Sequence, residues 1–140
     1  MGRRLCGAAL AAALIGLAAS GTQSIAEDDK DPSIKEIMTK AHKGGNSLLS
    51  TVGKDLKSAE PNWDDVQTKT KDLVKLGKSL GKNDPPKGDK ESWEKLTKSY
   101  LDTAKQLDDA VRAKEKSKAV TAHSKLTKMC ATCHKVHKGN

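Results

Sequence analysis

The chain has 140 residues, with 26 Lys or Arg against 18 Asp or Glu and a formal net charge of +8. This length holds one small domain, and lysines interleaved with acidic residues through its middle indicate a solvated surface. Nucleic-acid binding is disfavoured, because no aromatic side chains alternate with the basic ones to stack on bases.

Residues 1–26 have the pattern of a secretory signal peptide. A basic start is followed by the apolar run "AALAAALIGLAA", which is too short to span a bilayer, and by the small residues of "SIA". We expect cleavage after Ala26, which removes Cys6 and leaves residues 27–140 as the mature domain. The expected location is the periplasm or another exported compartment, without membrane attachment after cleavage.

The first structural element expected in the mature chain is one long helix over residues 34–56. Asp31 is its expected N-cap, and Pro32 suits the first helical position. Gly44 and Gly45 lie inside it, and each costs roughly 1 kcal/mol against alanine in a helix. The apolar residues keep the same helical phase on both sides of the glycines, so the pattern predicts a single helix.

Three more helices are expected, running from Trp63 to Leu80, from Trp93 to Val111 and from Ala119 to His137. The Pro- and Gly-rich loop 81–90 and a short polar link separate them, and no segment has the pattern of a strand. Four amphipathic helices with short connections predict an all-α, antiparallel four-helix bundle. Its core has only three aromatic residues, so a large apolar cofactor would help to fill it.

The chain ends in "MCATCHKVHKGN", which contains Cys130, Cys133 and His134. A zinc site needs about four ligands, usually including a second cysteine pair, and none is present. A thioredoxin-type dithiol begins a helix after a strand, whereas this pair lies near the end of a helical chain. A disulfide that closes so short a loop adds little stability, although a heme-free helical bundle with this disulfide stays an alternative.

Covalent heme attachment suits the same three residues best. On a helix Cys130, Cys133 and His134 fall on one side, so two thiols can form thioethers to a porphyrin while the imidazole points at the iron. Cys-x-x-Cys-His is the attachment sequence of c-type heme. One motif predicts one covalently bound heme c.

A signal peptide, four helices and a single CxxCH near the C-terminus resemble the layout of class II c-type cytochromes, cytochrome c-prime and its low-spin relatives. The resemblance covers residues 31–138 and implies a heme-bearing four-helix bundle that transfers single electrons and is not an enzyme. It places Lys138 at the family's basic position four residues after the histidine, and His137 where an aromatic residue is usual. Ile34 stands where family members often carry Arg, with Lys35 as a possible substitute.

The resemblance also places Met38 across the open face of the heme. His42 is four residues further on, so both side chains share one face of the helix and either can reach the iron. A thioether ligand raises the heme potential, as suits an electron carrier, whereas His42 would give a lower-potential bis-histidine site. Met38 as a core gap-filler and His42 as a partly exposed surface residue are the alternatives; His123 is expected beside the macrocycle.

A second function stays open, because five-coordinate members of the family leave this position without a ligand and bind nitric oxide or carbon monoxide. Lysines surround the cysteine pair, namely Lys125, Lys128, Lys135 and Lys138. They predict a basic surface that attracts an acidic redox partner protein. The chain is expected to be a monomer or a homodimer.

Overall fold

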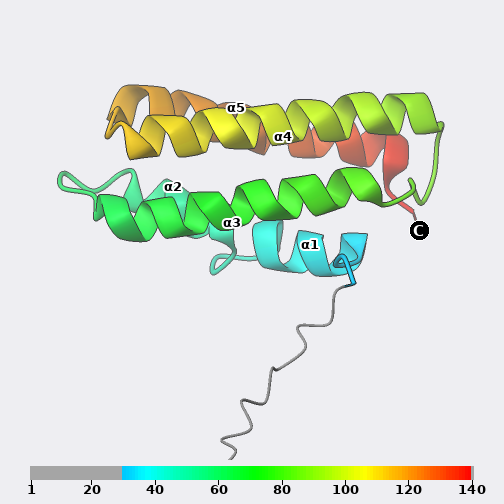
Figure 1. Ribbon diagram of the computed structural model, residues 1–140, viewed down its shortest axis with the longest axis horizontal. Coiled ribbons are helices and arrows are strands. Elements are labelled where there is room, and N and C mark those ends of the chain that lie inside the picture. Colours follow the sequence, from blue (N-terminus) through cyan, green and yellow to red (C-terminus); the bar gives the residue numbers. More distant parts are fainter. Residues whose placement is uncertain (1–29, 140) are drawn as a thin grey trace, which may run out of the picture.

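The computed structural model describes residues 30–139, and these residues form five helices and no strand (Figure 1). The all-α prediction is therefore confirmed. The expected signal peptide and its cleavage site at Ala26 lie outside the described residues. Among residues 30–139, none of the five helices combines the length and the apolar character of a membrane-spanning helix. The helices are α1 (Ile34–His42), α2 (Leu48–Asp55), α3 (Trp63–Lys82), α4 (Lys90–Arg112) and α5 (Lys116–His137).

The prediction of one helix over residues 34–56 is wrong, because the chain breaks between α1 and α2. Gly44 adopts a φ of +80°, a left-handed conformation that glycine reaches without steric cost. Ser47 then caps α2, accepting a hydrogen bond from the Ser50 N–H at 3.4 Å. Both helices bury their apolar residues in the same core, which explains why the apolar spacing shows no interruption.

The start of α1 also differs from the prediction. Ser33, not Asp31, is the N-cap, and Pro32 precedes the helix. Ser33 and Glu36 form a capping box in which each residue's side chain accepts a hydrogen bond from the other's backbone N–H. The Asp31 carboxylate instead accepts hydrogen bonds from the side chains of Ser79 and Lys82, at 2.9 and 2.8 Å, which ties the entry of α1 to the end of α3.

The three longer helices confirm the predicted segments and form the frame of the molecule. α4 packs against both α3 and α5, and α2 also contacts α3 and α5 (Figure 1). α1 packs against α2 and α3, and along the described backbone it comes close to neither α4 nor α5. The contacts between α1 and the α4–α5 pair are therefore made by side chains. The fully buried core residues include Ile37, Val52, Leu56, Val66, Leu73, Ala104, Leu107, Val111, Ala119 and Leu126.

The connection between α3 and α4 is fastened to three other parts of the chain. The Trp93 indole N–H donates to the Asn83 carbonyl at 2.7 Å, and the Asn83 side-chain amide donates to the Pro32 carbonyl at 3.2 Å. His137, near the end of α5, bonds to the Lys87 carbonyl at 2.7 Å. The loop therefore joins the entry of α1 to the last turn of α5, the helix that carries the cysteine pair.

Candidate cofactor site

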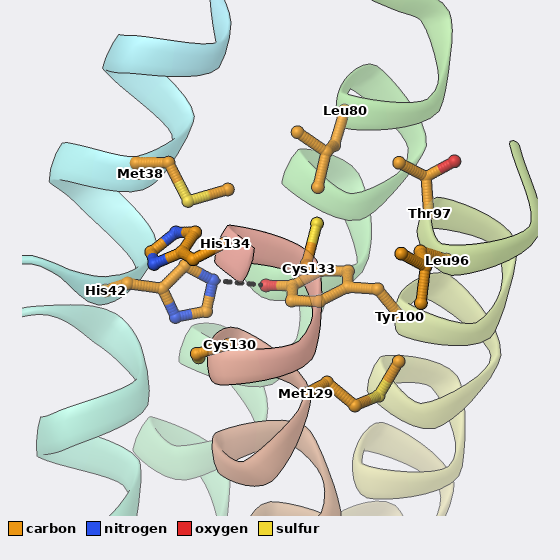
Figure 2. A pocket seen from close by; sticks show the side chains of 10 residues that line it. All are labelled: Met38, His42, Leu80, Leu96, Thr97, Tyr100, Met129, Cys130, Cys133 and His134. Carbon is orange, nitrogen blue, oxygen red and sulfur yellow. Dashed lines mark hydrogen bonds between the residues drawn. The ribbon is translucent and has the colours of Figure 1, made fainter. Parts of the chain in front are cut away.

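A pocket lies between α1, α3, α4 and α5, and the side chains with potential ligand atoms gather on it (Figure 2). Met38 and His42 face it from α1, and Cys130, Cys133 and His134 face it from the last two turns of α5. The remaining wall is mostly apolar. It consists of Leu80, Leu96, Thr97, Tyr100 and Met129.

Two further hollows adjoin this pocket. Met38, Cys133 and His134 also line a hollow of about 220 Å³ toward Trp93, while His42 and Cys130 also line one of about 330 Å³ beside α2. The central pocket is narrow, at about 30 Å³. The side chains with potential ligand atoms therefore separate three adjacent hollows. The volumes of the two larger hollows lie near or within the roughly 300–1,000 Å³ that is typical of ligand pockets. The donor set is chemically suited to a flat macrocycle held from both sides, and the partitioning side chains would have to move apart to join these hollows.

The two cysteines are free thiols in the structure and are not joined to one another. Both are half-buried, and burial raises the pKa of each thiol above its usual range. Redox-active dithiols have the opposite property, a pKa lowered at a helix N-terminus or beside a cation. Within the described residues no group of three or more His, Cys, Asp or Glu side chains could hold a metal ion, so the zinc alternative gains no support.

His42 is half-buried, and its ring lies in the pocket wall. Its Nε2 atom is hydrogen-bonded to the Tyr100 hydroxyl at 3.0 Å, and the two rings meet edge to face with centroids 5.5 Å apart. Burial, together with the nearby His134, lowers the pKa of His42 to about 4. The ring is therefore neutral at pH 7. Its Nδ1 atom is buried without a hydrogen-bond partner.

Met38 and Lys138 differ in their relation to the pocket. Met38 is half-buried against the core and lines both the central pocket and the hollow toward Trp93. Lys138 lines only that second hollow, together with Ile34, and its backbone N–H caps α5 on the His134 carbonyl at 3.2 Å. Lys35, the other cation considered, is exposed and lines none of these hollows.

His137 is a buried structural residue with both ring nitrogens satisfied. Its Nδ1–H donates to the Lys87 carbonyl, which can only accept, so Nε2 accepts from the Ser92 hydroxyl at 3.1 Å. The ring also meets the Trp93 indole edge to face, with centroids 5.4 Å apart. His137 thus fixes the last turn of α5, one turn after His134.

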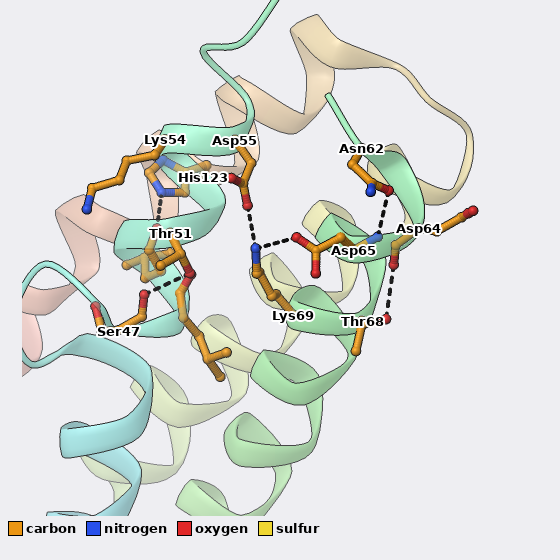
Figure 3. Close-up of polar contacts among 12 residues, drawn as sticks. Ser47, Thr51, Lys54, Asp55, Asn62, Asp64, Asp65, Thr68, Lys69 and His123 are labelled. Atoms are coloured by element: carbon orange, nitrogen blue, oxygen red, sulfur yellow. Dashed lines mark hydrogen bonds and ion pairs between the residues drawn. The ribbon is translucent and has the colours of Figure 1, made fainter. Parts of the chain in front are cut away.

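His123 does not line the central pocket, but it lines the adjoining hollow beside α2 together with His42 and Cys130. Its Nε2–H donates to the Leu49 carbonyl at 2.8 Å, which joins α5 to α2 (Figure 3). The separation from the pocket follows from helix geometry, because His123 lies two turns before Cys130 and faces α2.

Five residues of the pocket had no predicted role there, namely Leu80, Leu96, Thr97, Tyr100 and Met129. Met129 lines the pocket beside the cysteine pair. Its place directly before Cys130 in the sequence could have predicted this position. Tyr100 is buried in the core as expected, but its hydroxyl reaches His42 across 58 positions of the chain. Apolar spacing reports only which face of a helix is buried, so it could not have revealed this bond.

The helix that carries the cysteines is basic throughout. α5 has five lysines and neither Asp nor Glu, unlike α3 and α4, in which lysines alternate with acidic residues. Four lysines around the cysteine pair are exposed, namely Lys125, Lys128, Lys135 and Lys138. This face therefore has a positive potential that attracts anions.

Comparison with known proteins found no matching family model, no matching curated protein and no matching solved structure.

Proposed function

We propose that this chain is an exported monoheme c-type cytochrome with an antiparallel four-helix-bundle architecture, in which the α1–α2 pair takes the place of the first helix. Its function is to carry single electrons by cycling between Fe(II) and Fe(III). One observation carries the proposal: Cys130, Cys133 and His134 face a largely apolar pocket together with Met38 and His42 on the opposite helix.

Each of these residues has a distinct part in holding the group. Cys130 and Cys133 would form the two thioether bonds, and His134 would be the proximal ligand. Met38 is the proposed distal ligand, with His42 as the alternative, and Lys138 offers a cation at the edge of the site. The heme supplies the one-electron chemistry when bound, whereas the chain supplies orientation, ligation and dielectric.

The composition of the pocket supports a carrier over an enzyme. Neither Asp nor Glu occurs among the described residues that line it, and its two histidines are accounted for as ligand candidates. Leu80, Leu96 and Met129 provide apolar walls that exclude water and lower the local dielectric. Such walls favour a stable redox centre, whereas acid–base catalysis needs positioned proton donors and acceptors.

Intact mass measurement of the exported chain tests the attachment. We expect a mass that exceeds the mature polypeptide by one heme and is retained after denaturation, and loss of this mass in the variant Cys130→Ala, Cys133→Ala. A chain that is instead lighter by two hydrogen atoms would contain the disulfide and would refute the proposal.

Optical spectra of the ferric and ferrous protein, recorded with and without carbon monoxide, test the electron-carrier function. We expect low-spin spectra that carbon monoxide barely changes, with the charge-transfer band of methionine bound to ferric iron. A high-spin spectrum that responds at once to carbon monoxide would replace the carrier by the gas-binding function.

The redox partner is proposed to present an acidic docking face. The exposed lysines of α5 surround the turns that carry Cys130 and Cys133, so a partner attracted by them arrives next to the site. Complementary charges of this kind accelerate encounter more than they strengthen binding.

A further inference from the structure

Two potential distal ligands face the pocket from α1, but only one of them is held by another side chain. Met38 and His42 lie one helical turn apart and both line the pocket. The His42 Nε2 atom is occupied by the hydroxyl of Tyr100 at 3.0 Å, whereas no hydrogen bond or ion pair involves the Met38 side chain in the described structure.

Tyr100 is a fixed partner. It is only 7% exposed, and its ring lies against α3 at Gly77, where a β-carbon would come within 3.1 Å of Cε1. The ring is almost fully buried and packs against the α3 backbone, so the phenol has little room to move with His42. The hydroxyl therefore marks a constant position for Nε2.

His42 depends on this bond more than a residue within a helix would. It is the last residue of α1, and the chain after it turns through the left-handed Gly44. Its other ring nitrogen, Nδ1, is buried without a partner. The Tyr100 hydroxyl is thus the one hydrogen-bond partner of this imidazole in the described structure.

We propose that Tyr100 is a positioning residue that selects the distal ligand: by occupying Nε2 of His42, its hydroxyl keeps that nitrogen from the iron and leaves the iron to Met38. This inference rests on the proposed heme function. Without the hydroxyl, both nitrogens of a buried imidazole lack a partner, which is unfavourable, and coordination to iron is the nearest way to satisfy one of them.

The variant Tyr100→Phe tests the selection in the heme-loaded protein, because it removes the hydroxyl and keeps the ring that packs on Gly77. We expect loss of the methionine charge-transfer band, a spectrum that stays low-spin and unresponsive to carbon monoxide, and a lower reduction potential. Addition of His42→Leu to this variant should restore the methionine band, which a merely structural defect would not allow.

Thr103→Val is the matched control. Thr103 lies one turn further along α4, is 8% exposed, and donates its hydroxyl to the Ser99 carbonyl of its own helix, outside the pocket. Loss of the Thr103 hydroxyl should leave the methionine charge-transfer band unchanged. Circular dichroism of every variant establishes that the helices are intact.

Each outcome either supports or refutes the selection of the distal ligand by Tyr100. A Tyr100→Phe protein with the wild-type methionine band, or one that becomes high-spin and binds carbon monoxide, overturns the selection by Tyr100. A wild-type protein that is low-spin but lacks the methionine band overturns it too, since His42 would already be the ligand, yet leaves the electron-carrier function standing. Absence of the heme mass in the wild type removes both proposals.

Discussion

The imidazole of His123 lies directly against Gly53, where a β-carbon would come within 2.7 Å of the ring atom Cε1. The same ring donates to the Leu49 carbonyl, so glycine on α2 and histidine on α5 together set the distance between these helices. No bulkier residue at position 53 permits this approach without displacing the imidazole.

Gly53→Ala should therefore destabilise the protein by about 1–3 kcal/mol, as overpacking in a well-packed contact does. Gly45→Ala is the control, because the only atom near its new β-carbon is the flexible end of Lys54 at 3.7 Å. Its effect should stay within about 0.5 kcal/mol. Denaturant midpoints of the two variants give the comparison, and equal midpoints would contradict the assigned contact.

His137→Leu should destabilise the protein by about 1–3 kcal/mol, because it leaves the Lys87 carbonyl and the Ser92 hydroxyl without their partner. Ser92→Ala removes only one of the two hydrogen bonds and should cost about 1 kcal/mol. Chemical denaturation measures both changes. Hydrogen exchange in loop 83–89 should increase in His137→Leu, and an unchanged loop would mean that the ring does not hold it.

The lowered pKa of His42 makes stability depend on pH. Between the ordinary histidine value of 6.5 and about 4, the unfolded chain binds a proton at this site that the folded chain does not. The contribution of His42 to the free energy of unfolding is therefore fully present above pH 6.5. It declines as the pH falls toward 4, by about 3 kcal/mol at most.

Urea denaturation at several pH values checks this dependence in the variant Cys130→Ala, Cys133→Ala, which has no thiols for covalent attachment. Addition of His42→Gln should flatten the curve between pH 6.5 and 4. If the slope persists without His42, another group is responsible for it.

Met38→Leu should open the iron if the heme proposal is right. The thioether is lost while the apolar volume stays similar, so we expect a high-spin component that binds carbon monoxide. Met129→Leu is the matched control, because Met129 lines the same pocket but lies on α5, the helix of the proposed proximal ligand His134. Spectra that respond alike to both substitutions would show that Met38 has no special role.

The basic face of α5 should govern reaction with charged redox reagents. Lys128→Gln combined with Lys135→Gln should slow electron exchange with ferricyanide several-fold at low ionic strength, because anion steering depends on local charge. The paired control is Lys71→Gln with Lys78→Gln, two exposed lysines of α3. Stopped-flow rates across a salt series measure the effect, and equal slowing by both pairs would assign it to net charge alone.

The apolar pattern of the sequence predicted α3, α4 and α5 because each is one uninterrupted amphipathic segment with a clear turn at either end. It missed the break after His42 because α1 and α2 face the same core and their apolar residues remain in phase. The local signals were present: Gly44 for a left-handed turn and Ser47 for an N-cap. Ser33 and Glu36 likewise formed a capping-box pattern that outweighs Asp31 as a start signal.

The parts of the candidate site that lie on a single helix could be predicted from the sequence. Cys130, Cys133 and His134 face one side because of their spacing on one helix, and Met38 and His42 share a face for the same reason. The partners of His42, His123 and His137 lie 58, 74 and 45–50 positions away and depend on how the helices pack. No single-helix pattern contains that information.

The position of α1 has a consequence for the order of assembly. α3, α4 and α5 follow one another in the chain and pack as neighbours, so their contacts form early at a small loss of chain entropy. α1 joins them through α2 and α3 and meets α4 through the single His42–Tyr100 hydrogen bond of the described residues. If α3, α4 and α5 assemble first, α1 docks last about the turn at Gly44, and the side of the pocket opposite the cysteine pair stays open until it does. On this order of assembly, the turn that divides the first helix would let a group too large for a closed bundle reach the cysteine pair before α1 docks.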